Sequence, residues 1–409
     1  MPKILQINIV ADSGSHGRIV GQLNSRAMSL DWEGYIAYGR GETATINPRA
    51  FKIGNDADMY CHVLQTRLFD RHGLGSVKST GKLIRKIREI SPDIIHLHNI
   101  HGYYLNYKML FEYLNSTDIP VVWTLHDCWS FTGHCAQVAY TKCDKWLDGC
   151  CHCPEKGRYP ESWFTDRSEK NYELKKALFT ANKNITVVAV SDWLKGLVEQ
   201  SFLKCHPIER IYNGINLSVF KNHADWGVNV RNLYGIGERK LVLGVANRWN
   251  ERKGLDDFTA LRRILDDEYA IMLVGLTEGQ KNVLPVGIIG IGPTRSIHEL
   301  AGYYSAADVY VNPTWEESLS MTNIEAIACG TPVATYNSGG TVETLDKKTG
   351  IVVTPKNIGA LAESVKIICN RPDRALFRIH CRTRAEEMFD SARMCNEYFA
   401  LYNKILSKK

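Results

Sequence analysis

The sequence predicts an α/β fold made of two doubly wound domains. Its 409 residues exceed what one hydrophobic core usually supports. Short β-branched runs alternate with amphipathic stretches, and runs that are apolar on both faces imply parallel strands covered by helices on two sides. These runs form two sets, separated by a strand-poor region from Lys204 to Glu238. The boundary is therefore expected near residue 205.

The predicted strands follow from these apolar runs. The first set comprises 4–10, 93–98, 121–125 and 185–190, and the second comprises 241–245, 271–274, 286–291, 308–311, 333–335 and 351–353. Doubly wound sheets bind ligands at the carboxyl ends of their strands. Two facing domains of this kind would hold a donor and an acceptor in the cleft between them.

Composition indicates an ordinary soluble globular protein, with 44% hydrophobic and 23% charged residues. The net charge of +6 permits attraction to anionic substrates or to an anionic membrane surface. The amino-terminal apolar run reaches Asp12 too soon for a signal peptide, and no run approaches the roughly 18 apolar residues that span a bilayer. We expect a cytoplasmic protein with mostly reduced cysteines and no nucleic-acid partner.

Two glutamates eight positions apart, Glu317 and Glu325, are the most informative feature. A strand over 308–311 precedes them, Pro313 ends that strand, and 322–329 reads as a helix closed by glycine and proline. Glu317 then lies on a loop and Glu325 in the first turns of the helix. A loop carboxylate beside a helix N-terminus suits a ligand that has both hydroxyls and phosphates, as a nucleotide sugar does.

The segment 312–333 resembles the E-x7-E signature of the retaining group-one glycosyltransferases (family 4), a two-domain GT-B family. The resemblance covers nearly the whole chain, includes the Gly-Gly turn at 339–343, and is nearest to the subgroup of colanic-acid, capsule and exopolysaccharide biosynthesis. One departure is Ser318-Leu319-Ser320, where the family usually has Gly-Phe-Gly. Side chains there narrow the space for backbone to approach phosphate.

The resemblance implies two Rossmann-like domains with an inter-domain cleft. Residues 1–205 would bind the acceptor and carry a cysteine-rich insert at 128–153. Residues 206–387 would bind the nucleotide-diphosphate sugar, and 388–409 would form a helix that packs back on the first domain. The implied reaction moves a sugar, with retention, to a glycan or lipid-linked acceptor in cell-surface polysaccharide biosynthesis.

Two cations, Arg248 and Lys253, follow the strand 241–245. Cations at this spacing can clamp a diphosphate and stabilise the charge that grows as the sugar leaves. The family has an Arg and a Lys in matching positions, so both inherit the leaving-group role, while Arg252 reads as a solvated neighbour. Because they supply the positive charge, no cofactor is expected to be required for catalysis.

The same resemblance assigns the remaining donor contacts. Glu317 would hold sugar hydroxyls as a catalytic residue and Glu325 the ribose. Phosphates would meet the backbone amides of Leu319, Ser320, Met321 and Thr322. The first βα turn adds Gly14 and Gly17, because glycine loops let amides approach an anion, although a plain tight turn also explains them.

A histidine, His126, follows the strand 121–125 at its carboxyl end. Alone, such a histidine is often structural, but the family has a His in this Thr-x-His-Asp context that contacts the transferred sugar. We therefore expect His126 to be catalytic and Asp127 to orient it. His98, Asn99 and His101 follow another strand and resemble a family segment that faces the acceptor.

Half of the 12 cysteines crowd between residues 128 and 153. Cys135, Cys143, Cys150 and Cys153 have the right count for a tetrahedral thiolate site, and a reducing cytosol favours metal over disulfides. Three interpretations remain: a structural zinc, unbridged packing thiols, or disulfides. The cluster would brace the insert beside the acceptor cleft.

Other interpretations of the whole chain stay open. One is a nucleotide-sugar epimerase or another GT-B enzyme, and another is a catalytically silent sugar-nucleotide binding protein, which the Ser-Leu-Ser departure keeps open. The cationic segment 82–88 fits peripheral contact with the inner membrane as well as an ordinary solvated helix face.

Overall fold

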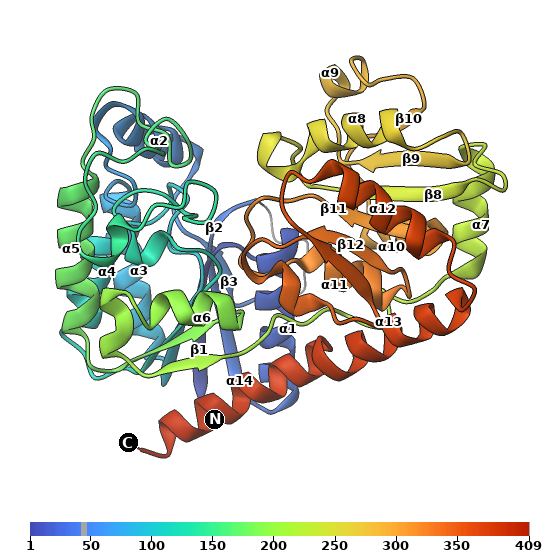
Figure 1. Ribbon diagram of the computed structural model, residues 1–409. Coiled ribbons are helices and arrows are strands. Elements are labelled where there is room, and N and C mark those ends of the chain that lie inside the picture. The colour runs from blue at the N-terminus through green and yellow to red at the C-terminus, as the bar shows by residue number, and fades with distance from the viewer. Residues whose placement is uncertain (42–46, 409) are drawn as a thin grey trace. The chain divides into compact units, whose positions relative to one another are not determined.

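The computed structural model describes residues 1–41 and 47–408, and the chain divides into two compact units. Unit 1 comprises Met1–Tyr212 and Met394–Lys409, and unit 2 comprises Asn213–Arg393 (Figure 1). The division comes later than the expected residue 205, because strand β7 (Ile208–Arg210) still pairs with the first sheet.

Unit 1 is built on a parallel seven-stranded sheet of order β3-β2-β1-β4-β5-β6-β7. Besides β7, its elements are β1 (Lys3–Val10), α1 (Gly14–Ser29), β2 (Glu33–Arg40), β3 (Ala50–Lys52), α2 (Asp56–Phe69), α3 (Val77–Ile90), β4 (Ile94–Leu97), α4 (Tyr107–Leu114), β5 (Val121–Leu125), η1 (Trp129–Phe131), η2 (Lys145–Leu147), α5 (Ser168–Ala181), β6 (Ile185–Ala189), α6 (Asp192–Val198), η3 (Phe202–Cys205) and α14 (Ser391–Leu406).

Unit 2 is built on a parallel six-stranded sheet of order β10-β9-β8-β11-β12-β13. Its elements are α7 (Ala224–Leu233), β8 (Lys240–Val245), η4 (Glu251–Lys253), α8 (Leu255–Ile264), β9 (Tyr269–Val274), α9 (Glu278–Lys281), β10 (Ile288–Ile291), α10 (Ile297–Ala306), β11 (Val309–Asn312), α11 (Met321–Ala328), β12 (Val333–Tyr336), η5 (Gly339–Thr344), β13 (Gly350–Val353), α12 (Ile358–Cys369) and α13 (Arg374–Met388).

The predicted α/β, doubly wound class is confirmed, and each predicted strand is present to within about two residues. Three strands were missed: β2, β3 and β7. The β2 segment contains a single β-branched residue, Ile36, and glycines at 34 and 39. Its strand conformation comes from parallel pairing with β1, in a register that runs from Lys3 with Glu33 to Val10 with Arg40.

In each sheet, the direction in which successive strands are added reverses once. The chain builds outward from β1 to β3, then returns to place β4 on the other side of β1, and unit 2 does the same with β8 and β11. Doubly wound folds bind ligands at the carboxyl ends of the strands that flank such a switch point. The loops after β1, β4, β8 and β11 are therefore the segments that each unit can devote to a ligand.

Helix α14 packs into the core of unit 1. Its Met394, Tyr398, Phe399 and Tyr402 cluster with apolar side chains of β1, α1 and β4. Polar contacts fix its register: the Tyr402 hydroxyl lies 2.7 Å from His96 Nδ1, and the Tyr398 hydroxyl lies 2.8 Å from the Thr124 hydroxyl. The core of unit 2 forms chiefly between β8, β9 and β11 and the helices α8 and α12.

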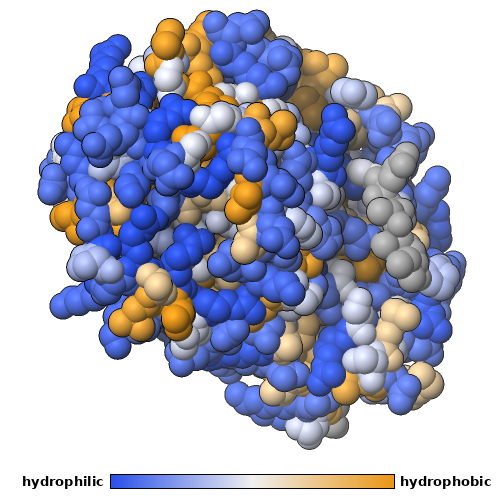
Figure 2. All heavy atoms as spheres, turned by 90° about the vertical axis from the view of Figure 1, so that its right-hand side faces the viewer, coloured by the Kyte–Doolittle hydropathy of each residue, from blue (hydrophilic) through white to orange (hydrophobic). Residues whose placement is uncertain are grey.

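The face drawn in Figure 2 is mostly hydrophilic, with apolar side chains in small separate groups. Within residues 1–41 and 47–408, no helix is both long enough and apolar enough to cross a membrane.

A buried histidine, His62 of α2, organises the loop after that helix. Its Nε2 accepts hydrogen bonds from the amides of Gly73 (3.0 Å) and Gly75 (3.2 Å), and its Nδ1 lies 3.0 Å from the Ser76 hydroxyl. An Nε2 that accepts two amides carries no proton, so the ring is neutral. Burial and the nearby Arg40 lower the pKa of His62 to about 3.

His62 should make stability depend on pH. The unfolded chain takes up a proton near pH 6.5 and the folded chain only near 3, so acid favours unfolding between these values. As the pH is lowered from 6.5 toward 3, the free energy of unfolding should decrease less steeply in His62→Gln than in the parent. The two slopes should differ by up to about 1.4 kcal/mol per pH unit. Urea unfolding at pH 7, 6 and 5 measures the difference. Gln65→Ala, an exposed change on the same helix, is the control, and equal slopes for His62→Gln and the parent would contradict the argument.

Candidate active site

The loops after β8 and β11 are joined by backbone contacts. The Trp315 amide donates to the Arg252 carbonyl oxygen at 2.9 Å, and the Thr314 hydroxyl donates to the same oxygen at 3.3 Å. Gly254, at φ +74°, lies so close to Pro313 that a Cβ there would come within 2.5 Å of the proline ring. These contacts place the predicted basic segment beside the predicted acidic loop.

Lys253 and Glu317 meet at this junction. Lys253 Nζ lies 3.3 Å from Glu317 Oε2, and the two side chains remain 34% and 24% exposed. Because both stay accessible, an ammonium and a carboxylate are presented together at the switch point of unit 2. The backbone supports this position: the Gly340 amide donates to the Glu317 carbonyl oxygen at 2.9 Å.

The basic segment differs from expectation at Arg252, which was predicted to be a solvated neighbour. Its guanidinium forms an ion pair with Glu316, and the two side chains are only 15% and 8% exposed. The prediction was wrong because Glu316 turns inward and supplies a buried partner. Arg248 is exposed, and no ion pair or hydrogen bond links it to Lys253 or Glu317 in the described part of the chain.

Glu325 lies in α11 and is 2% exposed. It accepts a hydrogen bond from the Tyr304 hydroxyl at 3.2 Å. Tyr310 of β11 lies within the influence of both glutamates: burial, and then the charges of Glu317 and Glu325, raise the pKa of its hydroxyl.

The Ser-Leu-Ser segment is used for packing and capping. Leu319 is buried, and the Ser320 hydroxyl caps α11 by accepting from the Asn323 amide at 3.3 Å and from Asn312 Nδ2 at 2.9 Å. The amides of Met321 and Thr322 precede that of Asn323 in the first turn of α11, where the helix itself provides no carbonyl oxygen to accept from them. They can bind an anion, while the Ser320 side chain is engaged inside unit 2.

A chain of hydrogen bonds in unit 1 determines which ring nitrogen of His126 carries the proton. Gln6 Nε2 donates to the Val20 carbonyl at 3.1 Å, which points Gln6 Oε1 at His98 Nε2, 3.4 Å away. His98 Nε2 then carries the proton, and its Nδ1, 3.3 Å from His126 Nε2, accepts from His126. This leaves His126 Nδ1 as a buried acceptor with no protein partner among the described residues.

The neighbouring rings are neutral. Burial lowers the pKa of His16 to about 4 and takes those of His98 and His126 well below the usual value. The His16 ring lies 4.2 Å from that of His126, and Asn99 Nδ2 donates to His16 Nδ1 at 2.9 Å. This arrangement can exchange hydrogen bonds with a polar ligand, but it supplies no positive charge.

A second chain of hydrogen bonds runs through Asp127. His101 Nε2 donates to Asp127 Oδ2 at 2.8 Å, and the Trp129 amide donates to Asp127 Oδ1 at 2.9 Å. Burial alone would raise the pKa of Asp127, but His101 and the Trp129 amide bring it below the usual value. His101 Nδ1 is thereby an acceptor, and the Tyr159 hydroxyl donates to it at 2.9 Å. Asp127 thus pairs with His101, not with His126, and its expected role as orienter of His126 has no direct contact behind it.

The first βα turn has the predicted glycines at the start of α1. Gly14 adopts φ +67° and opens the helix. A Cβ at Gly17 would lie 3.0 Å from the Asp12 amide nitrogen, so a larger residue would push the turn apart.

Comparison with known protein families shows to which family this chain belongs. Residues 42–219 match the family described as Glycosyltransferase Family 4, and residues 239–371 match Glycosyl transferases group 1. Together these ranges cover most of the chain. It belongs to the group 1, family 4 glycosyltransferases.

Relatives of this glycosyltransferase include proteins of polysaccharide and lipid glycosylation. It is 23% identical over 417 residues to WcaC of Escherichia coli K12, named as a colanic acid biosynthesis glycosyl transferase, with 98% of this chain and 100% of that protein covered. It is 31% identical to the GDP-mannose-dependent alpha-(1-6)-phosphatidylinositol monomannoside mannosyltransferase of Mycolicibacterium smegmatis, over 46% of this chain and 54% of that one.

Solved structures place the glycosyltransferase in the GT-B fold. Sucrose-phosphate synthase from Thermosynechococcus elongatus matches with a TM-score of 0.73 at 18% identity, covering all of both chains. Anabaena HepE in complex with UDP matches with a TM-score of 0.69 at 15% identity, covering 98% of this chain and 100% of that one. The predicted fold and the predicted family are both confirmed.

Two residues of the candidate site were missed by sequence reasoning. His16 had a signal, since it lies in the predicted glycine turn, but nothing in the sequence placed it beside His126. Tyr159 had none, because it reaches His101 from an irregular loop more than fifty positions later.

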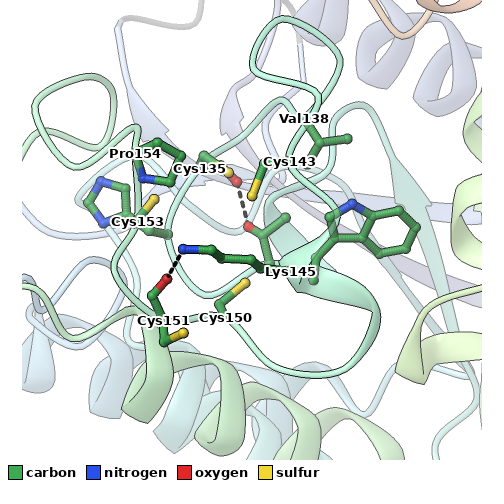
Figure 3. A pocket seen from close by; sticks show the side chains of 11 residues that line it. Cys135, Val138, Cys143, Lys145, Cys150, Cys151, Cys153 and Pro154 are labelled. Carbon is green, nitrogen blue, oxygen red and sulfur yellow. Dashed lines mark hydrogen bonds between the residues drawn. The ribbon is translucent and has the colours of Figure 1, made fainter.

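The cysteine-rich insert lies in unit 1. All its cysteines are free thiols, and Cys135, Cys143, Cys150 and Cys153 line one cavity (Figure 3). As they stand, no three histidine, cysteine, aspartate or glutamate side chains of the described residues form a group that could hold a metal ion.

Proposed function

We propose that this glycosyltransferase moves a sugar from a nucleotide-diphosphate sugar to a glycan or lipid-linked acceptor, with retention of anomeric configuration, in cell-surface polysaccharide biosynthesis. The observation that carries the proposal is the accessible Lys253–Glu317 pair at the switch point of unit 2, beside the helix start of α11. A cation, a carboxylate and unpaired helix amides together match a diphosphate joined to a polyhydroxylated ring.

The donor would be held by unit 2. The amides of Met321 and Thr322 meet phosphate oxygens, with those of Leu319 and Ser320 at the edge of the same turn. Glu317 accepts hydrogen bonds from sugar hydroxyls. Glu325 binds the ribose, for which it exchanges its contact with Tyr304. The names of relatives support a nucleotide sugar, since one is GDP-mannose-dependent and HepE was solved with UDP and with UDP-glucose.

The chemical step would rest on charge and orientation. Lys253, joined by the exposed Arg248, stabilises the negative charge on the departing diphosphate, so the step needs no metal cofactor. The acceptor hydroxyl attacks the face from which the diphosphate leaves, and a phosphate oxygen takes its proton. His126 Nδ1 accepts a hydrogen bond from a hydroxyl of the transferred sugar.

The acceptor would be bound by unit 1. His98 fixes the tautomer of His126, while Asn99, His101 and Asp127 offer polar contacts to acceptor hydroxyls. Gly14 and Gly17 would let the backbone of the first turn approach a phosphate.

Donor transfer is tested with a panel of UDP-, GDP- and ADP-sugars and with free or lipid-linked glycans. We expect nucleoside diphosphate release from one donor, dependent on acceptor and unaffected by a chelator of divalent metals. The glycosidic product should keep the anomeric configuration of the donor by NMR. An epimerised donor without acceptor would instead indicate an epimerase, and tight binding with no turnover would indicate a silent binding protein.

Two variants test the roles within the site. Glu317→Ala removes the sugar contact and Lys253→Ala removes the leaving-group cation, so each should lower turnover at least about tenfold, equal to 1.4 kcal/mol of transition-state stabilisation. Both side chains are partly exposed, so the melting temperature should stay close to that of the parent. Glu363→Ala, an exposed change on α12, is the matched control. Parental turnover in both site variants would show that the site is misplaced.

We also propose that the protein is cytoplasmic and contacts the cytoplasmic face of the inner membrane peripherally. On α3, Leu83 and Ile87 are buried while Lys82, Arg85 and Arg88 are exposed, so one face of this helix presents cations. Such a face attracts anionic lipid by roughly 1 kcal/mol per charge.

Sedimentation with lipid vesicles tests this contact. The parent should bind vesicles that contain anionic lipid and should dissociate in high salt, because salt screens the attraction. The double variant Lys82→Glu, Arg85→Glu should bind less. Equal binding of the double variant and the parent would remove α3 from the proposal.

A further inference from the structure

The cysteine-rich insert is long and nearly without regular structure. Between η1 and α5, over residues 132–167, the chain forms only turns and the single 3-10 turn η2. Irregular loops of this length are uncommon inside a compact domain, and those that occur are usually functional.

Four thiols line one cavity in this insert. Cys135, Cys143, Cys150 and Cys153 line the same cavity together with Lys145 (Figure 3). The thiols of Cys135 and Cys153 are in hydrogen-bond contact. Residues separated by up to eighteen positions therefore bring soft, metal-binding atoms to one site, although packing of the loop alone would not require a cysteine at any of them.

Backbone amides are aimed at two of the sulfurs. The Gly133 amide donates to Cys150 Sγ at 3.1 Å, and the Glu155 amide donates to the Cys153 thiol. Gly133 must be glycine, since a Cβ there would lie 2.0 Å from the Ser168 carbonyl oxygen. Amide hydrogen bonds to sulfur stabilise thiolates, which is the form that binds metal.

Two lysines lie near the cysteine cluster. Lys145 Nζ donates to the carbonyl oxygens of Cys151 (2.9 Å) and His152 (3.1 Å). The buried Lys175 donates to the carbonyl oxygens of Trp129 (2.7 Å) and Thr132 (3.0 Å), and it interacts electrostatically with Cys135 and Cys150. Four thiolates and one divalent ion carry a net charge of −2, and Lys145, which lines the cavity, can offset part of it.

We propose that Cys135, Cys143, Cys150 and Cys153 bind one zinc ion as a tetrahedral four-thiolate site. Four sulfur ligands with no open position match structural zinc. Each thiol loses its proton to solvent on binding, with no change in oxidation state. The thiols line the cavity without yet forming a finished metal group, so binding draws them together, which turns permit more readily than helices or strands do.

The zinc would brace the part of the insert that reaches the acceptor residues. From Cys153 the chain continues to Tyr159, whose hydroxyl donates to His101, and then to Trp163, whose amide donates to the Arg67 carbonyl at 2.7 Å. A metal at the base of this loop would hold Tyr159 in place. The metal claim itself does not depend on the transfer reaction.

Metal analysis of the full chain, expressed with added zinc and purified without chelator, tests the proposal. We expect about one zinc ion per chain. Cys135→Ser and Cys153→Ser should each keep less than about one fifth of it, because a site with three thiolates binds far more weakly. Cys61→Ser, and Cys151→Ser beside the site, are matched controls that should keep the metal.

A second measurement covers variants that fail to fold. The parent protein, stripped by a strong chelator, should take up one Co²⁺ ion, with the visible bands of tetrahedral cobalt and sulfur-to-metal charge transfer, and should melt at a higher temperature when zinc is restored. Parent protein with no zinc and four thiols that react with a thiol reagent would overturn the proposal. So would a mass lower by two hydrogens per bridge, which would indicate disulfides.

Discussion

The candidate site of unit 2 depends on the close contact between the loops after β8 and β11. Trp315 and Thr314 both donate to the Arg252 carbonyl oxygen, and Gly254 lets the backbone approach Pro313. A further glycine, Gly339, brings η5 against Glu317, where a Cβ would lie 2.1 Å from its carbonyl oxygen. Without this packing, Lys253 and Glu317 would be two unrelated surface charges. With it they form one accessible pair at a switch point, where the fold favours ligand binding.

The two units divide the chemistry by burial. In unit 2 the side chains of Lys253 and Glu317 stay partly exposed, so both can reach an ionic ligand. In unit 1 the rings of His98 and His126 are buried and neutral, so they act through the direction of their hydrogen bonds. Gln6 decides that direction: its carbonyl oxygen fixes the proton of His98, and His98 in turn leaves the acceptor atom of His126 free for a ligand. A buried glutamine thus sets the tautomer of a histidine that it does not touch.

The cysteine-rich insert is fixed to unit 1 by polar contacts at its two ends. Near its start, His134 Nδ1 lies 2.7 Å from Asp70 Oδ1, and near its end the Arg167 amide donates to Asp70 Oδ2 at 2.8 Å. One buried carboxylate therefore holds both ends of the loop. The middle, which carries the thiols, contacts the rest of unit 1 through Tyr159 and Trp163, and a metal cross-link there would add to the order of the acceptor residues.

Local patterns in the sequence determined the two sheets, most strand positions and the placement of Lys253, Glu317, His98 and His126 after strands, because β-branched runs and turn residues act over a few positions. Three features were decided only in three dimensions. Strand β2 was not predicted because it contains one β-branched residue and two glycines, and it is its pairing with β1 that establishes it. Arg252 is buried because Glu316, sixty-four positions away, turns inward to meet it. Asp127 pairs with His101, Tyr159 donates to the same histidine, and the His16 ring lies beside that of His126, because folding brings distant segments to one edge of a parallel sheet. Such contacts depend on which distant segments the topology places together, and no local pattern records that.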